Sequence, residues 1–188
     1  MKKNRDEIKA GALACLDEKR IPHVLGCEKA ALCLAERWNT DAADASVAAL
    51  LHDCTKRLSY EEHVEIITQS GVSIDSSLLN EPKLLHAVTG AIVAVRDFSV
   101  PEHIAGSIRW HTTGKPDMSM LEKIIYLADY IEETRDFDGV ELLRKLSFTD
   151  IDMAMTYGLE MSINYVRAGG REPHHDSVSA YEYYKNIK

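Results

Sequence analysis

Apolar residues recur at every third or fourth position along most of the chain, the spacing that gathers them on one face of an α-helix. Ile8, Ala12 and Leu16, for example, would share one face of a helix over residues 5–19. Runs in which apolar and polar residues alternate, the pattern of a half-buried strand, are hard to find. The pattern therefore predicts an all-α fold, a bundle of helices.

Capping residues indicate where further helices begin. Pro22 suits the first turn of a second helix. Ser59 and Glu62 have the spacing of a capping box, which recurs at residues 119–122, and Thr149 is expected to cap the last long helix. The predicted helices cover residues 5–19, 22–38, 41–53, 59–69, 82–98, 101–111, 119–135 and 149–167.

The composition changes little along the chain. There is no internal repeat, low-complexity linker or compositional break that would indicate a second domain. We therefore predict one domain over residues 1–188. The motifs described below lie within about residues 20–144, and a C-terminal helix and tail follow at 149–188.

The charge and the hydropathy of the chain argue against nucleic acid and membrane as partners. With a formal net charge of -8 and a pI of about 5.5, the protein lacks the basic surface that binds nucleic-acid phosphates. No apolar run approaches the ~18 residues of a membrane span, and the N-terminus has no signal-peptide core. We expect a soluble, cytoplasmic protein that binds neither nucleic acid nor membrane. Its four cysteines form no CxxC pair and are expected to stay reduced.

The segment LLHDCTK carries the most distinctive chemistry, because His52 and Asp53 stand side by side at the end of an apolar predicted helix. Adjacent helical residues point about 100° apart, so both reach one ion only if it lies beside the helix end. His23 and Asp129 are the candidates to complete such a site. Asp129 lies in the apolar segment IIYLADYIEE, and a buried carboxylate without a cation costs several kcal/mol.

Two imidazoles and two carboxylates make a mixed nitrogen and oxygen site, which suits divalent iron, manganese, cobalt, nickel or zinc. His86 and His111 add two imidazoles, so that the chain order is His, His-Asp, His, His, Asp. These two could hold a second metal ion bridged through Asp53. They could instead act as general acids, because imidazole titrates near neutral pH.

Basic residues that suit phosphate oxygens lie near the candidate ligands. Lys56 follows the His-Asp pair by three residues, and Arg135 follows the last candidate ligand by six. Thr112 could add a hydroxyl donor. The other polar candidates are interpreted as ordinary solvated side chains, namely Arg109, Lys115, His63, His103, His174 and His175.

With these residues in place, the chain resembles the HD-domain superfamily of metal phosphohydrolases, and within it the YqeK-type family of bacterial symmetrical bis(5′-nucleosyl)-tetraphosphatases. The resemblance rests on five segments in order: RIPHVLG, LLHDCTK, LLHAVTGAI, WHTTGKP and YLADYIEETR. It implies a central iron-type metal site held by His23, His52, Asp53 and Asp129. It further implies substrate contacts from His23, Asp53, Cys54, Thr55, Lys56, His86, His111, Thr112, Asp129 and Arg135.

The same resemblance implies the reaction, in which a dinucleoside polyphosphate, diadenosine tetraphosphate, is cut at its central bridge to give two ADP. A metal ion would lower the pKa of its bound water and supply hydroxide for attack on a central phosphate. The residues expected to act in catalysis are Asp53, Lys56, His86 and His111. Lys56 would offset charge that builds on the phosphates, and either His86 or His111 would protonate the departing ADP.

Other functions stay open on the sequence alone. A nucleoside monophosphate phosphatase or cyclic-nucleotide phosphodiesterase could use the same metal ligands, and a dinuclear iron oxygenase has the same order of His and Asp. A regulatory domain that keeps a structural metal would leave the nearby basic residues without a role. Five aromatic residues could stack on adenine or pack on a partner subunit of a homodimer, and packing in the core or at such an interface is the preferred interpretation; they are Trp38, Tyr60, Tyr181, Tyr183 and Tyr184.

Overall fold

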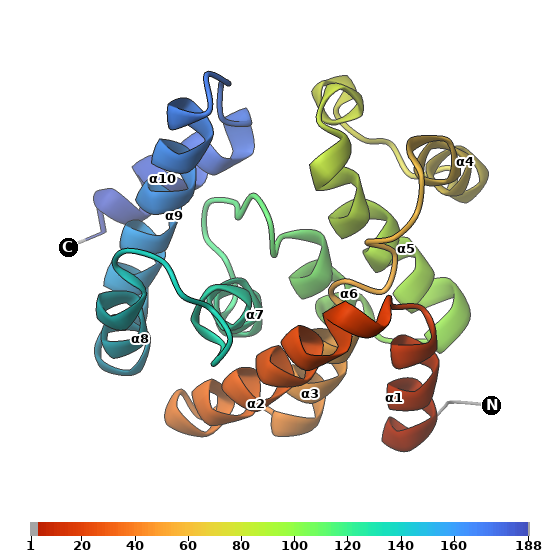
Figure 1. Cartoon of the computed structure of the whole chain (residues 1–188), viewed down its shortest axis with the longest axis horizontal. Helices are drawn as coiled ribbons and strands as arrows, with labels where there is room; N and C mark the ends of the chain where they lie inside the picture. The colour runs from red at the N-terminus through yellow and green to blue at the C-terminus, as the bar shows by residue number, and fades with distance from the viewer. Residues whose placement is uncertain (1–3, 188) are drawn as a thin grey trace.

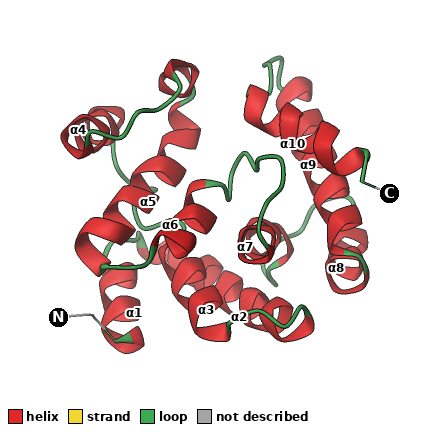
Figure 2. Ribbon diagram, turned by 180° about the vertical axis from the view of Figure 1, so that it is seen from behind, coloured by secondary structure: helices red, strands yellow, loops and turns green. Residues whose placement is uncertain are grey.

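Helices make up the regular structure of the chain. The computed structural model describes residues 4–187, and within them ten α-helices follow one another with no strand (Figure 1, Figure 2). The predicted all-α fold is confirmed. The helices are α1 (Arg5–Ala14), α2 (Ile21–Arg37), α3 (Ala42–Leu51), α4 (Tyr60–Ser70), α5 (Leu85–Phe98), α6 (Glu102–Arg109), α7 (Met120–Ile131), α8 (Val140–Thr149), α9 (Ile151–Ala168) and α10 (His175–Lys185), with short 3₁₀ turns at Glu18–Arg20, Ser76–Asn80 and Pro82–Leu84.

The alanine-rich helix α3 lies inside the core. Its residues 45–51 are all buried, and Leu50 and Leu51 are fully enclosed. Because alanine side chains are small, α2 packs closely along α3, while α1, α6 and α7 also contact it. Each buried leucine contributes about 1.5–3 kcal/mol. One apolar cluster runs from Ile8 in α1 to Tyr184 in α10, and on this basis we propose a single domain.

Both predicted capping boxes form. The Ser59 hydroxyl accepts the Glu62 N–H at 3.3 Å, and the Glu62 carboxylate accepts the Ser59 N–H at 2.7 Å. Ser119 and Glu122 repeat this arrangement at the start of α7. Gly71 ends α4 in the left-handed conformation, with φ of 68°. These local signals set the beginning of two helices and the end of one.

Two predicted helix ends are wrong. The first helix ends at Ala14 rather than at residue 19, because the chain becomes extended at Asp17 and enters a separate 3₁₀ turn. The helix expected to run to residue 135 ends at Ile131, because Glu132 adopts an extended conformation with ψ of 158°. That early end releases residues 132–139 as a loop beside the candidate site.

The C-terminal part also departs from the prediction. Thr149 does not cap the last long helix. It is the final residue of α8, and Asp150 caps α9 by accepting the Met153 N–H at 3.0 Å. The tail contains a further helix, α10, and no described helix is long and apolar enough to cross a membrane.

Several aromatic and sulfur side chains can now be placed. The Trp38 indole donates to the Ser147 carbonyl at 2.8 Å, and the buried Tyr184 hydroxyl accepts the Met118 N–H at 2.8 Å. Packing is therefore confirmed for these two, and Tyr181 packs partly buried against the core. Tyr60 and Tyr183 are exposed instead, and all four cysteines are free.

A buried acid ties α1 to α2 and α3. Glu28 is 4% exposed, and it pairs with Arg5, with Lys9 at 2.9 Å and with the Ser46 hydroxyl at 2.7 Å. Burial opposes its charge, but the hydrogen bonds from Ser46 and Lys9 outweigh burial and lower the pKa of Glu28 from 4.5. The carboxylate form is therefore the stable one in the folded protein.

We predict that Glu28→Gln lowers the free energy of unfolding at pH 7 by about 1–3 kcal/mol, because charge-assisted hydrogen bonds are lost. The folded pKa lies below the unfolded value of about 4.5, so this stabilisation is present above pH 4.5 and is lost as pH falls through the folded pKa. Urea denaturation at pH 7 and at successively lower pH should show the difference between wild type and variant narrowing. Glu36→Gln, at an exposed position on α2, is the control, and a pH-independent difference would contradict the prediction.

Candidate metal centre

Five helix ends meet at the candidate centre. Each helix end contributes a ligand candidate or, in one case, a pair. These are His23 in the first turn of α2, the His52–Asp53 pair directly after α3, His86 in the first turn of α5, His111 just after α6 and Asp129 in the last turn of α7. Side chains at helix ends reach a common point without interrupting the hydrogen bonds of the helix interiors. The structure thus brings together all the ligand candidates that the sequence pattern singled out.

Asp53 lies at the middle of the group and is 1% exposed. Its Oδ2 is 3.4 Å from His52 Nε2 and 3.7 Å from His23 Nε2. Its Oδ1 is 3.2 Å from His86 Nε2 and 3.9 Å from His111 Nε2. The two carboxylate oxygens therefore face two different pairs of histidines.

The backbone fixes how three of the rings present their nitrogens. The Nδ1 atoms of His52, His86 and His111 lie 2.7, 2.8 and 2.7 Å from the carbonyl oxygens of Ala49, Lys83 and Ile108. A carbonyl only accepts, so each Nδ1 carries the proton and donates it. The Nε2 atoms are then left as acceptors that point toward Asp53.

These Nε2 atoms need a cation. His52 Nε2 is buried with no hydrogen-bond partner among residues 4–187. His86 Nε2 and His111 Nε2 lie 3.0 Å apart, and two acceptors at that distance repel unless a proton or a metal ion lies between them. Asp129 Oδ1 is 3.2 Å from His23 Nε2 and adds a carboxylate. This set of nitrogen and oxygen donors fits a divalent transition metal ion.

Both predicted phosphate-binding cations reach the centre. Lys56 Nζ is 3.0 Å from His86 Nε2 and 3.9 Å from Asp53 Oδ1. Arg135 pairs with the Asp129 carboxylate, and its Nε donates to the Asp129 carbonyl at 2.7 Å. A metal-ligand cluster flanked by Lys and Arg can bind and polarise phosphoryl oxygens.

Comparison with known proteins agrees with this geometry. Residues 20–134 match the model of the HD domain family. The chain belongs to that family. Its HD domain places a cluster able to hold a divalent metal ion where the helix ends meet.

The alignments with two curated relatives cover most of this HD-domain protein. It is 36% identical over 182 residues to the symmetrical bis(5′-nucleosyl)-tetraphosphatase of Bacillus subtilis (strain 168), covering 96% of this chain and 97% of that one. It is 35% identical to the enzyme of the same name from Halalkalibacterium halodurans, covering 88% and 89%. A crystal structure from Clostridium acetobutylicum, described as a predicted HD superfamily hydrolase involved in NAD metabolism, matches all of both chains with a TM-score of 0.95 and 37% identity.

Sequence reasoning missed two residues of the HD-domain centre. Arg20 donates from Nε to Asp53 Oδ2 at 2.6 Å, and its place three residues before His23 in the RIPHVLG segment was an available signal. Glu132 is 1% exposed and accepts from His23 Nδ1 at 3.1 Å. Its carboxylate orients His23 as carbonyls orient the other rings. An acid three residues after Asp129 in an apolar helix was the signal for it.

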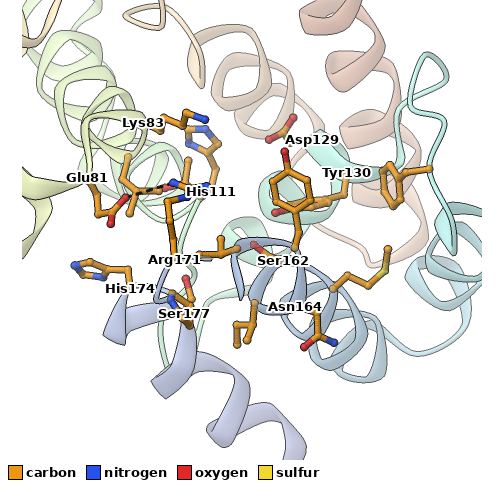
Figure 3. Close-up of a pocket in the computed structure, with 18 of the residues that line it drawn as sticks. Glu81, Lys83, His111, Asp129, Tyr130, Ser162, Asn164, Arg171, His174 and Ser177 are labelled. Carbon is orange, nitrogen blue, oxygen red and sulfur yellow. Dashed lines mark ion pairs between the residues drawn. The ribbon is translucent and has the colours of Figure 1, made fainter. Parts of the chain in front are cut away.

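A cavity of about 780 Å³ opens over the HD-domain centre (Figure 3). Lys56, His86, His111, Asp129 and Arg135 line it, as does Thr112, whose buried Oγ1 has no hydrogen-bond partner among the described residues. Residues 171–174 and 177 of the tail, which the sequence left unassigned, also line it. The C-terminal segment therefore forms part of the site.

Four predicted substrate contacts do not line this cavity, namely His23, Asp53, Cys54 and Thr55, and the first two lie buried in the metal centre. The Cys54 side chain belongs to the hydrophobic core. The Thr55 hydroxyl donates to the His86 carbonyl at 3.0 Å and pairs with Thr89 at 2.9 Å, so it holds α5 in place. Contacts from Cys54 and Thr55 to a ligand would have to come from their backbone.

Some residues interpreted as solvated are not. His63 is buried and bonds the Thr89 hydroxyl at 2.8 Å, and His174 is buried and bonds the Ser77 hydroxyl at 2.8 Å. The Arg109 guanidinium stacks on Trp110 at 4.3 Å, and its Nη1 is buried. These three interpretations were wrong; for His63 and His174 the reason is that the contacts are made with residues distant in the sequence. Of the other three residues interpreted as solvated, His103 and His175 are exposed, and Lys115 is partly buried, with its Nζ 3.2 Å from the Glu122 carboxylate.

The charges of the site follow from burial and from pairing. Burial opposes the charge on Asp53, but His52 and His86 outweigh it and hold the pKa of Asp53 well below its usual range. Burial, together with His86 and His52, lowers the pKa of His111 well below its usual value. Burial also lowers the pKa of His86. Near neutral pH the centre therefore offers an ionised Asp53 carboxylate and neutral His86 and His111 imidazoles, the forms that bind a metal ion, whereas Asp53 outweighs burial and raises the pKa of His52.

We predict that Glu132→Gln weakens metal binding about 10–100-fold, because His23 loses the carboxylate that orients it. Chelator competition with Mn²⁺ or Co²⁺ measures the dissociation constant directly. Glu133→Gln is a matched control, because the neighbouring acid is 64% exposed and pairs with Lys29 on the surface. Equal affinities for the Glu132 variant and wild type would show that Glu132 does not support the ion.

Proposed function

We propose that this HD-domain protein hydrolyses diadenosine tetraphosphate at its central bridge and releases two ADP. The observation that carries the proposal is the buried cluster of His and Asp, flanked by Lys56 and Arg135, at the floor of a cavity of about 780 Å³. The names of the two curated relatives supply the class of substrate, a bis(5′-nucleosyl) tetraphosphate, and the symmetry of the cut. A dinucleoside polyphosphate suits the site because its charge lies in the middle of the molecule.

We further propose His23, His52, Asp53 and Asp129 as ligands of the metal ion, and iron as that ion. When bound, a divalent ion polarises a phosphoryl oxygen and lowers the pKa of coordinated water toward neutrality. Asp53 Oδ1, which faces away from His52, is available with His86 and His111 for a second ion. The expected cytoplasmic location and homodimer stay predictions.

The residues of the chain bind and orient the phosphates. Lys56 and Arg135 approach the centre from two sides, because one contacts His86 and the other contacts Asp129. Each can donate to phosphate oxygens beside the bond that breaks and offset the charge that develops there. Thr112 adds a hydroxyl whose hydrogen bond is not used within the described chain.

The facing imidazoles supply a place for a proton. His86 Nε2 and His111 Nε2 are 3.0 Å apart, and both rings donate their Nδ1 protons to carbonyls. Either Nε2 can take up the proton that the attacking water releases and pass it to the departing ADP. If a second ion occupies the place, the same nitrogens bind it instead, and metal analysis giving two ions per chain would decide for that arrangement.

We predict that the iron-loaded protein converts each diadenosine tetraphosphate into two ADP, and that Asp53→Asn abolishes the reaction because both groups of donors lose their shared carboxylate. Anion-exchange chromatography of the products measures this. Asp6→Asn, which changes an exposed acid in α1, should retain full activity. Removal of the ion with a chelator should stop ADP formation, and added Fe²⁺ should restore it.

Other products would redirect the assignment. AMP plus ATP would contradict symmetrical cleavage. Activity on nucleoside monophosphates or cyclic nucleotides without cleavage of the dinucleotide would identify a phosphatase or a phosphodiesterase. An Asp53→Asn variant that still released ADP would show that the reaction occurs elsewhere.

A further inference from the structure

The cavity over the metal centre extends in two directions. Figure 3 shows Lys83, Arg171 and His174 on one side and Tyr130 and Asn164 on the other. From this arrangement we infer that the cavity contains two nucleoside subsites, and that Tyr130 and Phe137 form the subsite for one nucleoside of a dinucleotide substrate. The inference rests on the proposed function, because only a substrate with two nucleosides fills both sides.

The metal centre separates the two sides. Asp129 and Arg135, which pair with each other, line the cavity next to Tyr130. His86 and His111, whose Nε2 atoms lie 3.0 Å apart, line it on the other side of the centre. The bond that is cut would therefore lie between the two nucleoside-binding regions rather than at one end of the cavity.

The aromatic side has the features of a stacking platform. Tyr130 stacks on the fully buried Tyr126 with ring centroids 5.3 Å apart, so the core holds its ring in place. Phe137 meets Tyr130 edge to face at 6.5 Å, lies in the loop after α7 and is only partly buried. Both rings line the cavity, together with Asp138 and Asn164. Aromatic rings stack on bases, and these two polar side chains suit ribose hydroxyls.

Each side of the centre has a cation beside a metal-ligand candidate. On one side Arg135 pairs with Asp129, and Phe137 follows Arg135 by two residues in the same loop. On the other side Lys56 contacts His86, and Arg171, which pairs with Glu81 at 3.8 Å, also lines the cavity. A cation for the phosphates is thus present on both sides. Such an arrangement places the middle of a symmetrical polyphosphate over the metal centre.

The test compares a substrate that has two nucleosides with a ligand that has one. The Michaelis constant for diadenosine tetraphosphate and the inhibition constant of adenosine 5′-tetraphosphate are measured for wild type, Phe137→Ala and Phe137→Leu. In Phe137→Ala and Phe137→Leu, loss of base stacking should raise the Michaelis constant for diadenosine tetraphosphate roughly 10-fold. The inhibition constant should rise no more than about twofold, because the single adenosine can occupy the other side.

Two further variants and the products separate the possible outcomes. Phe137→Trp, which retains a stacking ring, should restore the Michaelis constant, and Phe148→Ala, at an exposed ring on α8, should leave both constants unchanged. Equal rises in the two constants, or no rise in either, would contradict the two subsites and leave the proposed function standing. If the wild-type protein did not release two ADP, the proposed function would fail and the subsites with it.

Discussion

Asp53 is an ionised carboxylate held almost entirely out of water, and such a group costs several kcal/mol unless donors or cations surround it. The C-terminal ends of α3, α6 and α7, which carry partial negative charge, converge on the same place. A lone positive side chain would not balance this concentration of negative charge. The helices are instead arranged so that imidazoles, Arg20 and Lys56 all reach one carboxylate, in a cluster able to hold a metal ion that would complete the balance.

Small residues make this convergence possible. A Cβ at Gly26 would lie 2.5 Å from Glu132 Oε2, so α2 must lack a side chain there if Glu132 is to reach His23. The alanines of α3 act similarly, because they let α2 lie close enough to bring His23 toward Asp53. The positions of the candidate ligands at the helix ends therefore depend on how closely α2 and α3 pack in the core.

The chemistry of the site could be anticipated from the sequence where the signal was local. His52 and Asp53 stand out because they are adjacent, and Asp129 because it interrupts an apolar helix. Glu132 had a local signal in its place three residues after Asp129, but nothing near His23 indicates that this acid, 109 residues away, accepts from its Nδ1. The same reason hides the burial of His174, which bonds Ser77 across 97 residues. Histidine is also an uncommon helix cap, so the start of α10 gave no recognisable sign.

The candidate metal ligands come from separate helix ends, and this has a thermodynamic consequence. An unfolded chain cannot hold these side chains together, so an ion that binds the centre binds the folded state alone. At 100 times its dissociation constant, such an ion adds about 2.7 kcal/mol to the free energy of unfolding. The supply of metal in the cell would then govern how long each molecule escapes proteolysis. A shortage of the ion would reduce both the amount of the protein and the fraction of its molecules that hold the ion.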